Sequence, residues 1–220
     1  KEVRAKMEGE GLAICCIASG ARMAVPDLEE RAEHVEDLRQ YIDLAADLGC
    51  EMVRVFGGAR DRGEELIATV DYVADGFVQV LDHAADRDVL LLLETHDDWC
   101  ASAPVRAVVE LVGHPNLKVL WDFMHSQRML EKPEESFQIL GEYTHHTHAH
   151  DGQIIDGKLQ VSGTLGSGLF DHEIPLRLLS EAGYSGYFSV EVIHKPGSEH
   201  NADAVLAQYA EQFQAIMAGF

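Results

Sequence analysis

The sequence predicts an α/β fold of the (β/α)8 or TIM-barrel type, in which about six of the eight βα units are visible. Apolar runs of strand length alternate with amphipathic helical segments along the whole chain, which indicates a parallel sheet with helices outside it. The length of 220 residues, with 46% hydrophobic and 25% charged residues, is typical of one large globular domain. We therefore predict a single domain over residues 1–220 that is N-terminally incomplete, with its first two strands missing.

The first half of the chain contains three strand and helix pairs after an opening helical segment that ends at Gly11. Asp27 follows a proline and is a suitable N-cap, and Gly49 is a suitable stop for the helix between them. The predicted strands cover 12–20, 51–58 and 89–96, and the predicted helices cover 2–10, 27–48 and 64–86.

The second half of the chain continues this alternation. A proline opens the helix at Pro133, and Gly183 ends the later helix that begins near Pro175. Many glycines lie between residues 152 and 168, so we predict an irregular loop there. The predicted strands cover 117–122, 145–151 and 187–192, and the predicted helices cover 102–112, 133–143, 175–181 and 201–217.

Charge and cysteine content exclude several classes of protein. Lys and Arg number 17 against 38 Asp and Glu, a net charge of −21 that argues against binding nucleic acid. We find no apolar run long enough to cross a bilayer, so no membrane partner is expected. The four cysteines form no CxxC pair, which favours reduced thiols and a cytoplasmic location. We also expect a homo-oligomer.

Four polar residues lie at or near the downstream ends of predicted strands. In a (β/α)8 barrel these ends form the face that carries the chemistry, and side chains alternate across each strand. If each polar set points into the barrel, one imidazole and three carboxylates converge on a common point. This oxygen-rich set suits Mn²⁺ first, then Mg²⁺, with Co²⁺ or Zn²⁺ possible. The predicted metal ligands are Glu94, Asp122, His148 and Glu191.

An ordered set of motifs resembles a known family, the xylose isomerase-like TIM barrels, also called the sugar phosphate isomerase/epimerase group. The resemblance covers nearly all of the chain, and the motifs are individually loose but specific in their order. They are Leu-Leu-Leu-Glu94-Thr-His, Asp122-x-x-His125, His148-x-His150-Asp151, Gly166-Ser-Gly-Leu-Phe-Asp171, Ala182-Gly-Tyr-Ser-Gly-Tyr187 and Val190-Glu191.

The resemblance implies a function and roles for the matching residues. It implies one divalent metal on the four ligands above, with Glu94 and Glu191 as the catalytic pair that moves protons at adjacent carbons of a small carbohydrate. It also implies that His125 touches the substrate. A metal that bridges a carbonyl and the neighbouring hydroxyl acidifies the carbon-bound proton and stabilises an enediolate, and a carboxylate within reach removes the proton.

Further residues are candidates for substrate binding. His96 either contacts substrate or orients Glu94, and Trp99 could form a wall against a sugar face. His150 belongs to a histidine run with His145, His146 and His148, in which one member is expected to be a ligand and the others to be solvated or hydrogen-bonded. The match to the family motif, and not the chemistry alone, favours His148 as that ligand. His172 and His194 flank loops at the same predicted face and are lesser candidates.

Functions other than an isomerase or epimerase also fit these residues. The ketose 3-epimerase branch has an arginine a few residues after the third ligand, whereas this chain has Gly152-Gln153-Ile154-Ile155, which weakens the case for a ketohexose. A dehydratase would use the same metal and base to expel water. A six-unit barrel could also be a degenerate or partner-completed module, because its open edges invite pairing. The apurinic endonuclease branch fits poorly, since its extra histidines are not visible before Glu94 and the charge is wrong for DNA.

Overall fold

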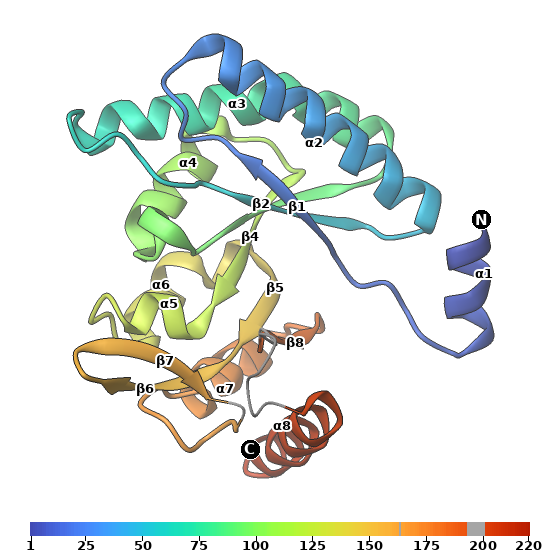
Figure 1. The fold of residues 1–220 in the computed structure, drawn as a ribbon, viewed down its shortest axis with the longest axis vertical. Helices are drawn as coiled ribbons and strands as arrows, with labels where there is room; N and C mark the ends of the chain where they lie inside the picture. Colours follow the sequence, from blue (N-terminus) through green and yellow to red (C-terminus); the bar gives the residue numbers. More distant parts are fainter. Residues whose placement is uncertain (163, 193–200) are drawn as a thin grey trace. The chain divides into compact units, whose positions relative to one another are not determined.

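The computed structural model describes residues 1–162, 164–192 and 201–220, and Figure 1 labels its elements in chain order. The strands are β1 (Ile17–Arg22), β2 (Met52–Phe56), β3 (Leu90–Glu94), β4 (Leu117–Asp122), β5 (Thr144–Ala149), β6 (Asp151–Ile155), β7 (Lys158–Ser162) and β8 (Phe188–Val190). The α-helices are α1 (Glu2–Gly9), α2 (Leu28–Leu48), α3 (Leu66–Asp86), α4 (Ser102–Val112), α5 (Phe123–Gln127), α6 (Pro133–Leu140), α7 (Glu173–Glu181) and α8 (Ala202–Met217). Two 3₁₀ helices are η1 (Asp97–Trp99) and η2 (Gly141–Tyr143).

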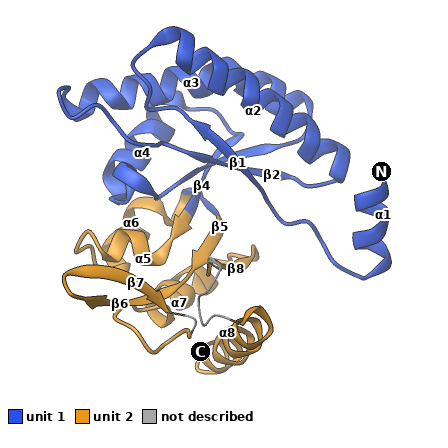
Figure 2. Ribbon diagram, in the orientation of Figure 1, with its two compact units in different colours: residues 1–120, 143–145 blue, residues 121–142, 146–220 orange. Residues whose placement is uncertain are grey.

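The predicted alternation of strands and helices is confirmed. Six strands form a parallel sheet in the order β1-β2-β3-β4-β5-β8, and β6 pairs with β7 in a separate hairpin. This is the arrangement of a partial TIM barrel. Figure 2 shows the two compact units into which the chain divides: residues 1–120 with 143–145, and residues 121–142 with 146–220.

The first unit is a parallel sheet covered by long helices. Val53 and Val55 are fully buried, whereas Arg54 and Phe56 alternate with them and belong to the opposite face of β2. Helices α2 and α3 run side by side in Figure 1, and α4 packs against α3. The register of β2 on β3 places Phe56 beside Glu94, so the downstream ends of these strands coincide.

The ends of the helices follow the local sequence. Asp27 caps α2, because its Oδ1 accepts hydrogen bonds from the backbone N–H groups of Glu29 and Glu30 at 3.0 and 2.9 Å. Gly49 ends the same helix with a φ of 71°, a left-handed conformation that glycine adopts without strain. Among the described helices, none combines the length and apolar character that crossing a membrane requires.

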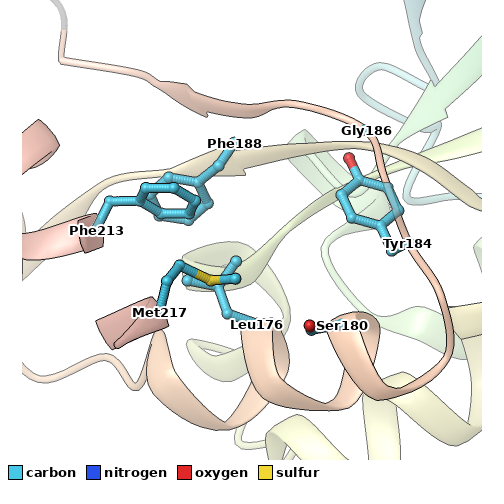
Figure 3. A pocket seen from close by; sticks show the side chains of 7 residues that line it. All are labelled: Leu176, Ser180, Tyr184, Gly186, Phe188, Phe213 and Met217. Carbon is cyan, nitrogen blue, oxygen red and sulfur yellow. The ribbon is translucent and has the colours of Figure 1, made fainter. Parts of the chain in front are cut away.

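The second unit contains the strand pair β5 and β8, the hairpin β6–β7 and helices α5 to α8. In the parallel pair, His148 lies opposite Ser189. A cavity of about 80 Å³ lies in this unit, and Figure 3 shows the aromatic rings of Phe188 and Phe213 beside each other in its wall. Their centroids are 5.0 Å apart and the rings are stacked. Among the described residues that line this cavity there is no acid, base or histidine, and none of the predicted metal ligands is one of them.

Two local predictions were wrong, and one short helix was missed. The first strand covers Ile17–Arg22 rather than 12–20. Ile17 pairs with Val53 near the start of β2, so most of the apolar residues that precede Ile17 have no partner residue on β2. The expected loop at 152–168 contains the hairpin β6–β7. Asp156 and Gly157 have φ values of 51° and 73° and form its two-residue turn, for which Asp-Gly is a strong sequence signature. Helix α5 was not predicted.

Candidate metal centre

Asp122 ends β4 and begins α5, so one residue is both the last of a buried strand and the cap of a helix. Its side chain is fully buried, and its Oδ1 accepts a hydrogen bond from the backbone N–H of His125 at 3.1 Å. This capping bond sets the orientation of the carboxylate and begins the short helix that carries His125. The spacing of three residues in Asp122-x-x-His125 therefore has a structural cause.

Two imidazoles lie beside the Asp122 carboxylate. His150 Nε2 is 2.7 Å from Asp122 Oδ2, and His125 Nε2 is 3.8 Å from the same oxygen. Burial alone would raise the pKa of Asp122, but the charge of His125 and the hydrogen bond from His150 outweigh burial and hold this pKa well below its usual range. The pKa of His150 is raised because the hydrogen bond to Asp122 outweighs its own burial.

His148 and Glu191 form a second contact in the same unit. His148 lies on β5, and its Nδ1 is 3.0 Å from Glu191 Oε2. Glu191 follows β8 and continues its ladder, because its backbone N–H donates to the Ala149 carbonyl at 3.0 Å. Burial would raise the pKa of Glu191, but the hydrogen bond from His148 lowers it on balance.

These contacts bring three of the four predicted metal ligands together. Asp122, His148 and Glu191 each offer a ligand atom, and these atoms lie within 4.8 Å of one another. Asp122, His125 and His150 form an overlapping group by the same criterion. Two largely buried carboxylates at this separation repel each other unless positive charge lies between them. The oxygen and imidazole donors therefore fit a divalent cation such as Mn²⁺ or Mg²⁺, or Co²⁺ or Zn²⁺.

Glu94, the fourth predicted ligand, belongs to the first unit. It is fully buried at the downstream end of β3, and its Oε2 is 3.2 Å from Arg54 Nε. Arg54 was not predicted as a site residue, because a single arginine inside an apolar strand has no motif around it. The convergence of Glu94 with the other three ligands remains a prediction from the sequence.

His96 and Trp99, both predicted to bind substrate, also lie in the first unit just after β3. His96 is partly buried, its Nδ1 is 3.0 Å from Asp97 Oδ1, and its ring centroid is 4.7 Å from that of Phe56. Trp99 is fully buried against Gly57, where an added Cβ would approach the indole ring to 2.2 Å. Gly57 therefore makes room for Trp99.

Two further histidines, His146 and His172, have hydrogen-bond partners in the second unit. His146 Nε2 is 2.8 Å from Ser189 Oγ, and burial lowers the pKa of His146 to about 4, so this imidazole is neutral at pH 7. His172 Nε2 is 3.2 Å from the backbone carbonyl oxygen of His150, the residue that follows β5. His194 lies outside the described residues.

Asp151 organises the loop that follows the third ligand strand. This carboxylate is fully buried, and its oxygens accept backbone hydrogen bonds from Gly152 at 2.8 Å, Gly166 at 2.9 Å and Gly168 at 2.8 Å. The Tyr209 hydroxyl donates to the Ser162 carbonyl and accepts from the Asp151 backbone N–H, both at 3.3 Å. Gly166 and Gly168 were the only hint of this arrangement in the sequence. Each of these glycines allows its backbone N–H to approach the Asp151 carboxylate closely.

Comparison with known proteins gives a consistent picture. The sequence profile of a family described as xylose isomerase-like TIM barrel matches residues 1–214. A putative hydroxypyruvate isomerase from Homo sapiens is 27% identical over 184 residues, which is 76% of this chain and 62% of that protein. A 3-dehydroshikimate dehydratase from Bacillus anthracis is 26% identical over 117 residues, 52% of this chain and 41% of that protein. The chain thus spans less than two thirds of these curated relatives.

Solved structures share the fold at low sequence identity. The crystal structure of the IolI protein with a bound zinc atom has a TM-score of 0.85 at 17% identity, covering 100% of this chain and 83% of that chain. The structure of an L-ribulose 3-epimerase has a TM-score of 0.81 at 19% identity, covering 98% of this chain and 78% of that chain. These similarities concern the fold.

Proposed function

The chain belongs to the xylose isomerase-like TIM barrel family, and we propose that it acts as a divalent-metal-dependent isomerase or epimerase of a small sugar, polyol or sugar phosphate. The observation that carries this proposal is the gathering of Asp122, His148 and Glu191 within 4.8 Å in a largely buried cluster. The relatives named isomerase and epimerase support it. We expect a cytoplasmic enzyme that forms a homo-oligomer and takes a small carbohydrate substrate.

Four residues would hold the metal: Glu94, Asp122, His148 and Glu191. Mn²⁺ is the expected ion, because three carboxylates and one imidazole favour a hard cation over a thiophilic one. The bound metal would act as a Lewis acid on a substrate carbonyl and its neighbouring hydroxyl. His150 and His125 would keep the Asp122 carboxylate in place, as outer partners of metal ligands commonly do.

Glu94 and Glu191 would carry out the proton transfers. One carboxylate removes the proton from the carbon next to the carbonyl, and the other returns a proton to the same or the neighbouring carbon. The pKa of Glu191 is lowered by its hydrogen bond from His148, so this carboxylate is ionised at neutral pH and ready to accept a proton. His125, His96, His150 and Trp99 are the proposed substrate-binding residues.

Metal analysis followed by hydrogen exchange tests the proposal. The purified protein should contain close to one divalent ion per chain, measured by plasma mass spectrometry. In D₂O, the protein should introduce deuterium beside the carbonyl of a small ketose or ketose phosphate. The variants Glu94→Gln and Glu191→Gln should abolish this exchange while the circular dichroism spectrum stays unchanged. Full exchange in either variant would remove that residue from the mechanism.

A dehydratase is the second candidate, and the similarity to a 3-dehydroshikimate dehydratase favours it. The same base and metal would remove a proton and expel the hydroxyl on the adjacent carbon as water. Mass spectrometry of the product separates the two candidates. A product 18 Da lighter than its substrate would identify a lyase, whereas an unchanged mass supports the isomerase or epimerase.

A further inference from the structure

Arg54 is a buried cation whose charge the proposed chemistry does not use. Its side chain is 11% exposed, and its Nε is 3.2 Å from Oε2 of the fully buried Glu94. The Nη1 group donates to the Ser19 carbonyl at 2.9 Å. Within the described residues, no hydrogen-bond acceptor meets Nη2, so one edge of the guanidinium is left to bind another group.

The Phe56 ring restricts the position of the Arg54 guanidinium. Its Cζ is 3.7 Å from the centroid of the Phe56 ring, and Phe56 in turn packs against the ring of His96 at 4.7 Å. Such stacking fixes the plane of the donors in advance, and a planar guanidinium matches the geometry of carboxylate and phosphate oxygens. Phe56, Glu94 and His96 lie at the downstream ends of β2 and β3 or just beyond, and Arg54 lies two residues before the end of β2, all within the first unit.

The charge balance at Arg54 changes when Glu94 acts as a metal ligand. A buried guanidinium stays protonated and is costly unless an anion compensates it. Glu94 is the carboxylate that pairs with Arg54 in this structure. A divalent cation would draw on the same carboxylate and weaken its attraction for Arg54, so an anionic acceptor at the open edge of the guanidinium would replace part of that attraction.

We infer that Arg54 binds an anionic group of the substrate, so that the substrate is a small hydroxy-ketone that carries a carboxylate or a phosphate rather than a neutral sugar. This inference rests on the proposed function, because it takes the metal and the catalytic glutamates from it. Arg54 would thereby determine substrate specificity. A neutral analogue offers no anionic acceptor, so the buried Arg54 donors would stay unpaired and the analogue would bind more weakly.

Three compounds with the same ketol unit test the inference: dihydroxyacetone, which is neutral, hydroxypyruvate, which carries a carboxylate, and dihydroxyacetone phosphate. Solvent exchange with the Mn²⁺-loaded protein gives kcat/KM for each. In Arg54→Gln, the ratio of kcat/KM for the preferred anionic compound to kcat/KM for dihydroxyacetone should fall roughly 10- to 100-fold through KM, because any effect of the lost Glu94 contact acts on both compounds alike. The preferred anionic compound identifies the group as carboxylate or phosphate. Arg54→Lys should recover part of the loss, because it keeps the charge and loses the planar fork.

A matched control and a binding measurement separate this role from a structural one. Arg106→Gln removes an arginine that pairs with Glu110 on the surface of α4, and it should leave all three values unchanged. Calorimetry should show the same roughly 10- to 100-fold weaker binding of hydroxypyruvate or dihydroxyacetone phosphate to Arg54→Gln. An equal loss for the neutral and anionic compounds, with a lowered melting temperature, would overturn the inference.

The calorimetric result also separates failure of the inference from failure of the proposed function. If none of the compounds exchanges but anion binding still depends on Arg54, the isomerase proposal fails and the anion site stands. If exchange occurs and Arg54→Gln treats neutral and anionic compounds alike, the isomerase proposal stands and the anion site fails.

Discussion

Asp122 shows how one side chain can serve two purposes when its oxygens have separate partners. Oδ1 caps α5 through the His125 backbone N–H at 3.1 Å, and Oδ2 lies 2.7 Å from His150 Nε2. The first contact is available to an amide oxygen as well as to a carboxylate, whereas metal binding needs the negative charge. Substitution by asparagine should therefore separate capping from metal binding.

In Asp122→Asn, we predict that the fold is retained and that Mn²⁺ binds at least about 100-fold more weakly. Loss of a residue that only hydrogen-bonds to a metal ligand lowers metal affinity by roughly 10- to 100-fold, and loss of a ligand should lower it further. A competing chelator measures the affinity, and circular dichroism monitors the fold. Asp171→Asn is the control, since Asp171 Oδ1 also accepts a helix-starting hydrogen bond, from the Ile174 N–H at 2.9 Å, and is not a predicted metal ligand. Metal binding of wild-type strength in Asp122→Asn would contradict the assignment.

Tyr209 predicts a dependence of stability on alkaline pH. Its burial raises the pKa of the phenol from 10.0 to about 12. Between these values, the unfolded chain releases this proton and the folded chain retains it, so the contribution is complete below pH 10 and is lost as pH rises toward 12. We expect on the order of 2 kcal/mol of unfolding free energy to disappear over this range.

Urea denaturation of wild type and Tyr209→Phe, at several pH values between 9 and 12, measures this contribution. The variant should be less stable by about 1 kcal/mol at pH 9, because the hydroxyl bonds to Ser162 and Asp151 are lost. The gap between the two proteins should narrow or reverse as the pH rises. A gap independent of pH would show that the phenol titrates at its ordinary value.

At the scale of elements, the segment after β5 is held together by one buried carboxylate. The hairpin β6–β7 begins with Asp151, and the following loop returns Gly166 and Gly168 to the same carboxylate oxygen. A Cβ at Gly168 would approach Asp151 Oδ1 to 2.0 Å and the Gly152 carbonyl oxygen to 2.4 Å. Backbone atoms cannot move aside cheaply, so this position accepts no larger residue without a shift of the loop.

We predict that Gly168→Ala lowers the free energy of unfolding by about 1 to 3 kcal/mol. The displaced carboxylate loses hydrogen bonds, and because His150 precedes Asp151, Mn²⁺ affinity should fall as well. Gly20→Ala is a suitable control, since no atom lies within 4 Å of the Cβ that it adds. Urea titrations of the two variants measure the difference. Equal stability would show that the loop repacks freely around the methyl group.

At the scale of the whole molecule, the excess of acidic residues should govern the response to salt. The net charge is −21, and repulsion among like charges opposes compaction. Raising NaCl from about 0.1 to about 1 M shortens the screening length from roughly 10 to 3 Å. The melting temperature should therefore rise by at least about 2 °C. The same salt step at a pH where the net charge is near zero is the control. A fall at neutral pH would mean that attractive ion pairs outweigh the repulsion.

The order of elements could be predicted, and candidate metal ligands could be proposed, because both depend on local patterns. Glu94, Asp122 and Glu191 each come at or next to the end of an apolar strand, and strands that alternate with helices have their downstream ends at one edge of a parallel sheet. Asp27 and Gly49 marked the ends of a helix for the same local reason. The hairpin at Asp156 and Gly157 also had a local signature, but the many glycines around it favoured a loop.

The sequence by itself determined the strand and helix alternation, the family and the candidate ligands, because hydrophobic periodicity, helix caps and motif order are properties of neighbouring residues. Only the tertiary structure decided that Arg54 pairs with Glu94, that His150 rather than His146 meets Asp122, and that Asp151 gathers the glycine loop. Such contacts join residues far apart in the chain. Their distances depend on strand register and side-chain conformation, which no local pattern specifies.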